Sequence, residues 1–407
     1  MALILRVPLL STEVSSLQRS LDAPWRVAKP SRWKSLQSIF PIPVRAATEE
    51  PDRLVENGTA QKPAVALLSQ DPTVAKDVGA GVLIQGVLDV SSPLPSDDSG
   101  VRNISPDLAA IYACCKDWTW RGYRIVYTTK GRGPPLLLVH GFGASLGHWR
   151  KNIGVLSQSY RVYAIDLLGL GASEKPSEFK YTMETWADII VDFIKEVICE
   201  PTILIGNSIG SLACTIAAAA EAPEELVRGM VLLNCAGGMN NKAVVDDWRI
   251  RLFLPLLWLI DLLLLQRSIA SRLFQRVQSR ENLRNVLQAV YCNKDAVDEE
   301  LIEIIAAPAR DAGALDAFVS IITGPPGPSP ISIFSDISIP VLVLWGDKDP
   351  FTPIDGPVGR WFSGLPATQS NVQLRLLENV GHCPHDDRPD LVHKELLPWL
   401  EDVCDSK

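Results

Sequence analysis

Apolar residues between positions 118 and 349 come in short continuous runs, most of them followed by glycine or by a polar turn. Runs of four to six apolar residues without alternation are typical of parallel strands buried on both faces of a sheet. The stretches 182–197 and 211–222 between them have helical patterns. The sequence therefore predicts an α/β fold, with a mostly parallel, doubly wound sheet and helices on both faces. The predicted strands lie in WTWRGYRIVY (118–127), which alternates large and polar residues, and in LLLVHG (136–141), RVYAIDLLGLG (161–171), TILIGNSIG (202–210), MVLLNCAGG (230–238) and VLVLWGDKD (341–349).

The strand rhythm stops between about residues 239 and 336, where the pattern is helical and closes with the loop GPPGPSP. We interpret this segment as a helical cap inserted into a catalytic domain that covers residues 113–404. Residues 47–112 are rich in Pro, Asp, Ser and Gly and are predicted to form a linker or loosely attached arm.

The N-terminal segment 1–46 carries seven Arg or Lys residues against two acidic ones, recurrent serines, and no continuous apolar core of the secretory type. This composition predicts an organelle transit peptide, and VRAAT (44–48) resembles a plastid processing site. A disordered basic tail is the simpler alternative. The predicted location is the chloroplast.

The overall composition changes this picture little, with 47% apolar residues, 21% charged residues and a net charge of −8. The negative charge argues against a nucleic-acid partner. The eight cysteines show neither C-x-x-C spacing nor clusters with histidine, so they are predicted to be scattered thiols of a reducing compartment.

Ser208 lies in GNSIG (206–210), directly after an apolar strand and before a helix rich in small residues. The G-x-S-x-G pattern at a strand-to-helix turn is typical of a serine nucleophile, because glycines at 206 and 210 remove side chains that would clash in the sharp turn. The start of the following helix would face a developing oxyanion.

Two later strand ends supply a base and an acid for this serine, which needs a base to take its proton. Asp349 follows the strand VLVLW in WGDKDPFTP, and His382 lies in the loop GHCPHDD. The order Ser, Asp, His is the one found in serine hydrolases with this pattern. His382 is predicted to act as base and then as acid, and Asp349 to set its tautomer.

An oxyanion also requires preorganised donors. The loop HGFGAS (140–145) follows the strand LLLV, and we expect the backbone N–H groups of Phe142 and Ile209 to form the oxyanion hole, with Gly143 as the alternative to Phe142.

Five neighbouring residues have competing interpretations. Asp347 is an alternative acid, although the glycine spacing favours Asp349. His385 and His140 are expected to stabilise their own loops, Asp166 to cap a turn, and Cys383 to be an ordinary packed thiol.

With these motifs the chain resembles the serine α/β-hydrolase superfamily over about residues 118–404. Within it, the chain is similar to the plastid hydrolases of the chlorophyll dephytylase type, of which pheophytinase is a near relative. This narrower resemblance rests on GNSIGS, LLNCAGGMNNKAV, FVSIITGPPGPSP, DGPVG and GHCPHDDRPDLVH. Epoxide hydrolases and haloalkane dehalogenases have aspartate where Ser208 stands, which favours ester chemistry.

The resemblance implies hydrolysis of the phytyl ester of chlorophyll a, chlorophyll b or pheophytin to phytol and a chlorophyllide-type product, in chlorophyll turnover. It implies no metal or organic cofactor, since any magnesium belongs to the substrate. Three alternatives stay open: a lipid or methyl esterase, an acyltransferase, and a ligand receptor with slow turnover.

The most apolar stretch is LFLPLLWLIDLLLL (252–265), inside the predicted cap. As a helix it would span about 21 Å, short of a hydrocarbon core about 30 Å thick, and Pro255 and Asp261 interrupt it. An ordinary buried cap helix would explain it. The alternative is a lid that cradles the prenyl tail through Leu257 and Leu264, while arginines at 267, 272, 276 and 280 rest on anionic thylakoid lipid.

Overall fold

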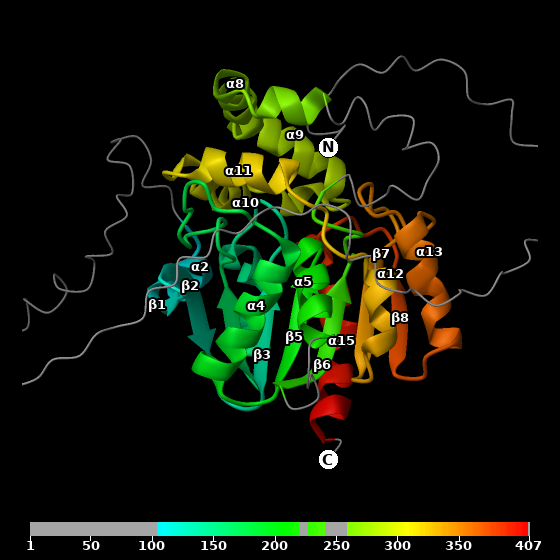
Figure 1. Ribbon diagram of the computed structural model, residues 1–407. Coiled ribbons are helices and arrows are strands. Elements are labelled where there is room, and N and C mark those ends of the chain that lie inside the picture. Colours follow the sequence, from blue (N-terminus) through cyan, green and yellow to red (C-terminus); the bar gives the residue numbers. More distant parts are fainter. Residues whose placement is uncertain (1–103, 220–225, 241–258, 406–407) are drawn as a thin grey trace, which may run out of the picture. The chain divides into compact units, whose positions relative to one another are not determined.

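The computed structural model describes residues 104–219, 226–240 and 259–405. An eight-stranded sheet forms the centre of this part of the chain, and helices pack against it (Figure 1). The strands are β1 (Cys115–Trp120), β2 (Tyr123–Lys130), β3 (Pro135–Val139), β4 (Arg161–Ile165), β5 (Thr202–Asn207), β6 (Val227–Leu233), β7 (Val341–Gly346) and β8 (Val372–Leu377).

The strand order in the sheet is β1-β2-β4-β3-β5-β6-β7-β8. Strand β2 pairs antiparallel with both β1 and β4, and every other neighbouring pair is parallel. The predicted α/β class with a mostly parallel sheet is therefore confirmed. The carboxyl ends of β3 to β7 meet at one edge, where ligands bind in sheets of this type.

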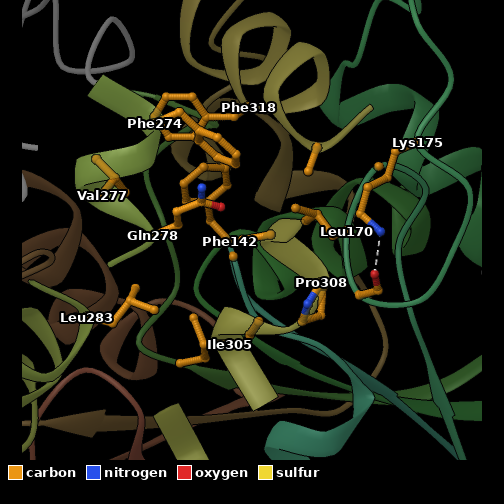
Figure 2. A pocket seen from close by; sticks show the side chains of 16 residues that line it. Phe142, Leu170, Lys175, Phe274, Val277, Gln278, Leu283, Ile305, Pro308 and Phe318 are labelled. Carbon is orange, nitrogen blue, oxygen red and sulfur yellow. Dashed lines mark hydrogen bonds between the residues drawn. The ribbon is translucent and has the colours of Figure 1, made fainter. Parts of the chain in front are cut away.

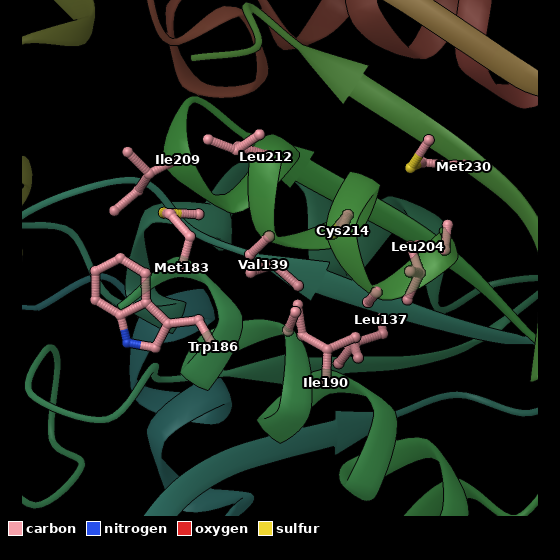
Figure 3. Packing of buried hydrophobic residues seen from close by; sticks show 14 of the residues in the cluster. Leu137, Val139, Met183, Trp186, Ile190, Leu204, Ile209, Leu212, Cys214 and Met230 are labelled. Carbon is pink, nitrogen blue, oxygen red and sulfur yellow. The ribbon is translucent and has the colours of Figure 1, made fainter. Parts of the chain in front are cut away.

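The central strands are buried on both faces because alternate residues enter two different cores. Along β3, Leu137 and Val139 pack into one core, while Leu136 and Leu138 pack into the other. Figure 3 shows the first of these cores, in which Trp186 and Ile190 of a flanking helix lie with strand residues. The continuous apolar runs of the sequence are explained by this double burial.

The helices of the core are α2 (Pro106–Ala113), α3 (Arg150–Leu156), α4 (Met183–Phe193), α5 (Ile209–Ala218), α13 (Pro357–Gly364), α14 (Pro384–Asp387) and α15 (Pro389–Asp405). Between β6 and β7 lie the described helices of the cap. These are α8 (Arg267–Val277), α9 (Arg280–Val290), α10 (Glu299–Ala306), α11 (Ala314–Thr323) and α12 (Pro330–Ile333). Helices α8 to α11 gather at one end of the sheet (Figure 1).

Three local features differ from the expectations. The stretch 118–127 is not one strand but a hairpin, because Arg121 and Gly122 both have positive φ, at 47° and 90°, and reverse the chain. Helix α2 lies in the last residues of the predicted linker and buries Leu108 and Ile111, so the folded domain includes it. Strand β8 was not predicted.

The described residues contain no helix that is both long enough and apolar enough to cross a bilayer. All eight cysteines lie in this part of the chain and none of them forms a disulfide.

Candidate active site

Ser208 occupies the sharp turn between β5 and α5, with φ 56° and ψ −119°. A positive φ is strained for any residue other than glycine, and such strain is characteristic of functional turns. The flanking glycines are required by close approaches. A Cβ at Gly206 would lie 2.5 Å from the Ser211 amide nitrogen, and one at Gly210 would lie 2.4 Å from the Val139 carbonyl oxygen.

Strand β6 and the loop that follows it hold this turn in place through main-chain hydrogen bonds. The Ser208 N–H donates to the Leu233 carbonyl at 3.0 Å, and the Ser208 carbonyl accepts from the Ala236 N–H at 3.1 Å. The Ser211 hydroxyl adds a bond to the Gly206 carbonyl at 2.7 Å. The strained conformation is therefore fixed by its surroundings.

His382 and Asp349 are brought together by the loops that follow β8 and β7. Nδ1 of His382 lies 2.8 Å from Oδ2 of Asp349, and both side chains are buried. The same carboxylate accepts hydrogen bonds from the Asn234 side-chain amide at 2.7 Å and from the Phe351 N–H at 2.7 Å, with further bonds from Thr352.

Burial alone would raise the pKa of Asp349. The attraction of His382 and these hydrogen bonds outweigh burial and lower the pKa to about 2. Asp349 is therefore ionised at neutral pH, as a partner of a histidine base must be.

Asp347, the alternative acid, contacts groups other than His382. Its Oδ1 accepts from the Val380 N–H at 3.3 Å, and its Oδ2 pairs with the Lys348 ammonium at 2.7 Å. The structure brings Asp349, and not Asp347, against His382.

Two contacts join the serine turn to its predicted partners. The side-chain amide of Asn207, the residue before Ser208, donates to the His382 carbonyl at 3.0 Å. On the other side, a Cβ at Gly141 would lie 3.3 Å from the Ser208 Cβ. The serine turn, the histidine loop and the predicted oxyanion loop therefore meet at the carboxyl ends of the strands.

His140 orients the predicted oxyanion loop. Its Nε2 accepts from the Leu167 N–H at 3.1 Å, so the proton resides on Nδ1, which donates to the Gly141 carbonyl at 2.7 Å. Burial lowers the pKa of His140 and keeps it neutral. Because the C=O and N–H of a trans peptide point in opposite directions, the Phe142 N–H of this peptide is turned away from His140.

The second predicted donor, the Ile209 N–H, lies in the first turn of α5, where backbone N–H groups have no partner within the helix. The roles of Phe142 and Ile209 remain predictions. Asp166 is buried and accepts from the Leu146 and Ala172 N–H groups at 2.6 and 2.7 Å, so it ties two loops near the site together.

His385 and Cys383 lie beside the candidate base but face away from this chemistry. The His385 ring is fully buried against Trp149, with ring centroids 4.1 Å apart, and against His148, at 4.6 Å. Burial lowers the pKa of His385 and raises that of the Cys383 thiol. Both groups are therefore neutral packing residues.

A pocket of about 600 Å³, including its open mouth, lies between the cap and the loops after β3 and β4 (Figure 2). Three phenylalanines lie along it with tilted rings: the Phe142 and Phe318 ring centroids lie 6.2 Å apart, and those of Phe274 and Phe318 lie 5.1 Å apart. Its lining also includes Leu170, Val277 and Leu283. Because Phe142 belongs to both the pocket and the predicted oxyanion loop, the pocket adjoins the candidate site.

The predicted substrate-binding leucines do not contribute to this pocket as far as the structure describes them. Leu264 is 2% exposed and is not among the lining residues, and Leu257 lies outside the described residues. Phe274 and Phe318 carry no signal in the sequence that marks them as lining residues. Phe142 and Gly143 of the lining do, because they lie in the predicted oxyanion loop.

A model of the alpha/beta hydrolase family matches residues 136–395, more than half of the chain. The chain is similar to the chloroplastic pheophytinase of Arabidopsis thaliana, with 26% identity over 310 residues, which cover 66% of this chain and 61% of the relative. It therefore spans less than two thirds of the length of pheophytinase. It is also similar to epoxide hydrolase 3 of Xenopus tropicalis, with 26% identity over 292 residues, covering 69% and 76% of the two chains.

Among solved structures, the chain is similar to the serine hydrolase involved in carbazole degradation called the CarC enzyme. The TM-score is 0.55 at 22% sequence identity, over 70% of this chain and 98% of that one. At this identity the similarity concerns the fold alone.

Proposed function

The chain belongs to the alpha/beta hydrolase family, and we propose that it is a serine ester hydrolase that cleaves the phytyl ester of chlorophyll pigments. The products are phytol and a chlorophyllide-type pigment, and the setting is chlorophyll turnover. In the acyl-enzyme intermediate, the propionyl group of the chlorin would be bound to Ser208.

Ester chemistry is supported by the residue at the sharp turn after β5. Ser208 stands where epoxide hydrolases carry aspartate. A serine with a buried histidine and an ionised aspartate is the set of groups that acyl transfer requires.

In the proposed reaction His382 takes the proton of the Ser208 hydroxyl as the oxygen attacks the ester carbonyl. The N–H groups of Phe142 and Ile209 receive the negative charge on the carbonyl oxygen. His382 then gives its proton to the phytol oxygen as the C–O bond breaks. Water, activated by the same histidine, releases the free acid from Ser208.

The observation that carries the substrate class is the apolar pocket between cap and core. It adjoins Phe142 and is lined mainly by aromatic and aliphatic side chains, a chemistry that suits a ligand with a long hydrocarbon part. The pocket is proposed to hold the prenyl chain of the alcohol. The similarity to pheophytinase, at 26% identity, supports a pigment as the acyl part.

The test is turnover of chlorophyll a, pheophytin a and a short-chain nitrophenyl ester by the purified protein beginning near residue 47. We expect phytol release from at least one pigment. Turnover of the short ester alone would contradict the pigment proposal and favour another esterase or an acyltransferase, which added alcohol acceptors would reveal. Tight pigment binding without turnover would favour a receptor.

We further propose that the protein is a chloroplast protein that rests on the thylakoid surface. The basic segment 1–46 and the chloroplastic relative support import, although this segment lies outside the described residues. Leucines 259, 262, 263 and 265 are between 41% and 65% exposed, and Arg272 and Arg276 are exposed on the next helix. An apolar patch beside arginines suits an anionic lipid surface.

Helix α8, which carries Arg272 and Arg276 of this patch, also contributes Phe274 and Val277 to the lining of the pocket. A prenyl ester dissolved in lipid would therefore have a short apolar path to the proposed site.

The double variant Leu262→Ser/Leu265→Ser is expected to reduce sedimentation with anionic phosphatidylglycerol vesicles at least about tenfold, since two leucines lose their burial in lipid. Leu376→Ser is the matched control, because Leu376 is 48% exposed on β8, outside this patch. Binding that is equal for the two variants, or equal on neutral and anionic vesicles, would argue against the proposed surface. Leu264 is unsuitable for this purpose because it is buried.

A further inference from the structure

The loop that carries His382 is bound to the cap. The His382 N–H donates to the Val290 carbonyl, at the end of α9, with a nitrogen-to-oxygen distance of 2.9 Å. The contact is so close that a Cβ at Gly381 would lie 1.9 Å from the same carbonyl oxygen. The end of α9 is therefore in direct contact with the loop of Gly381 and His382, called the histidine loop below.

Asp387 joins these two segments through its carboxylate, which is fully buried. Oδ2 accepts from the Gly381 N–H at 2.7 Å and from the Cys292 N–H at 3.0 Å, and Oδ1 accepts from the Asn293 N–H at 2.7 Å. One oxygen atom thus bridges the histidine loop and the cap. Hydrogen bonds from N–H groups to a carboxylate are stronger than those to a neutral acceptor.

We propose that Asp387 is a positioning residue, which holds the backbone of Gly381 and His382 in register with the end of cap helix α9. The position of the candidate base is then coupled to the cap through this carboxylate. This inference rests on the proposed function, since it gives His382 the role of the base.

The physical reason lies in how His382 is held. Its ring is directed by Asp349, but its backbone is held by the Asn207 side chain and by the Val290 carbonyl, both of which contact the main chain at 382. If Gly381 loses its acceptor, the loop can move relative to both. A displacement of about 1 Å in a catalytic group costs about 10²-fold in rate.

Asp386 is the matched comparison, because it lies on the same turn of α14 and is equally buried. Its carboxylate contacts the Arg150 guanidinium at 3.1 Å and the Tyr291 hydroxyl at 3.2 Å, and among the described residues it makes no hydrogen bond to the backbone of Gly381 or His382. Loss of either carboxylate weakens the attachment of the cap, but only Asp387 acts on the histidine loop.

The experiment compares Asp387→Asn with Asp386→Asn in the full domain. In Asp387→Asn an amide NH₂ replaces one oxygen, so at least one backbone N–H faces a donor. We expect kcat for a nitrophenyl ester to fall about 10- to 100-fold, with KM within about threefold. The rate of fluorophosphonate labelling of Ser208 should fall in parallel. In Asp386→Asn both rates should stay within about threefold of wild type.

Hydrogen exchange, followed by mass spectrometry of the peptides that contain residues 378–383 and 290–293, separates this inference from the proposed function. Exchange should be faster in Asp387→Asn than in Asp386→Asn at equal distance below each melting temperature. Equal exchange would overturn the coupling even if the protein hydrolyses esters. Faster exchange in a protein that hydrolyses no ester would support the coupling and contradict the proposed function.

Discussion

Replacing Ser208 with alanine is expected to lower kcat for ester hydrolysis by about 10⁵- to 10⁶-fold, which would leave no measurable release of phytol. The hydroxyl is the only group removed, and its oxygen is the atom proposed to attack the carbonyl. The N–H groups of Phe142 and Ile209 would remain, but they have no covalent step to assist.

The variant should fold as the wild type does. Alanine meets the same positive φ as serine, and the main-chain hydrogen bonds to Leu233 and Ala236 do not involve the hydroxyl. The measurement is pigment and nitrophenyl-ester turnover, with a fluorophosphonate probe and the melting temperature as controls. A folded Ser208→Ala protein that retains more than about one hundredth of the wild-type rate would exclude Ser208 as the nucleophile.

Asp349→Asn is expected to lower kcat by about 10⁴-fold in a protein that still folds. An asparagine NH₂ facing Nδ1 of His382 would donate to that nitrogen. The ring proton would then reside on Nε2, where it prevents the histidine from taking the serine proton. The carboxylate charge that stabilises the imidazolium would also be lost.

Asp347→Asn is the matched control for this change. Asp347 lies two residues away on the same loop, but it contacts the Val380 N–H and the Lys348 ammonium. Its substitution should alter the rate by less than about threefold. The reverse result, with Asp347→Asn inactive and Asp349→Asn active, would show that the wrong aspartate had been identified.

The central strands could be predicted from the sequence because both of their faces are buried, which leaves continuous apolar runs. The edge of the sheet could not. Strand β8 exposes Gln373 and Leu376 while it buries Val372 and Leu377, so its pattern is neither continuous nor strictly alternating. In the hairpin of β1 and β2, the turn residue Arg121 has a positive φ that its type does not announce.

The candidate site, too, could be predicted from the sequence only in part. Ser208, Asp349 and His382 follow strands and carry glycine signals, so spacing alone indicated them. The pocket is different, because Phe274 and Phe318 come from separate cap helices and meet only through packing. Asp387 gave no signal either, since an acidic residue in a loop resembles a solvated one until its three backbone donors are known.

The hydrogen bonds that join the loop of His382 to residues 290–293 also limit which segments can be exchanged between this protein and a relative. An exchange of the cap with that of a relative, as a means of changing substrate preference, would place a foreign segment against Gly381 and Asp387. The crossover points should therefore keep 290–293 together with 381–387 from one parent. Helices α8 and α11, which carry Phe274 and Phe318 of the pocket, can be exchanged while these two segments are kept.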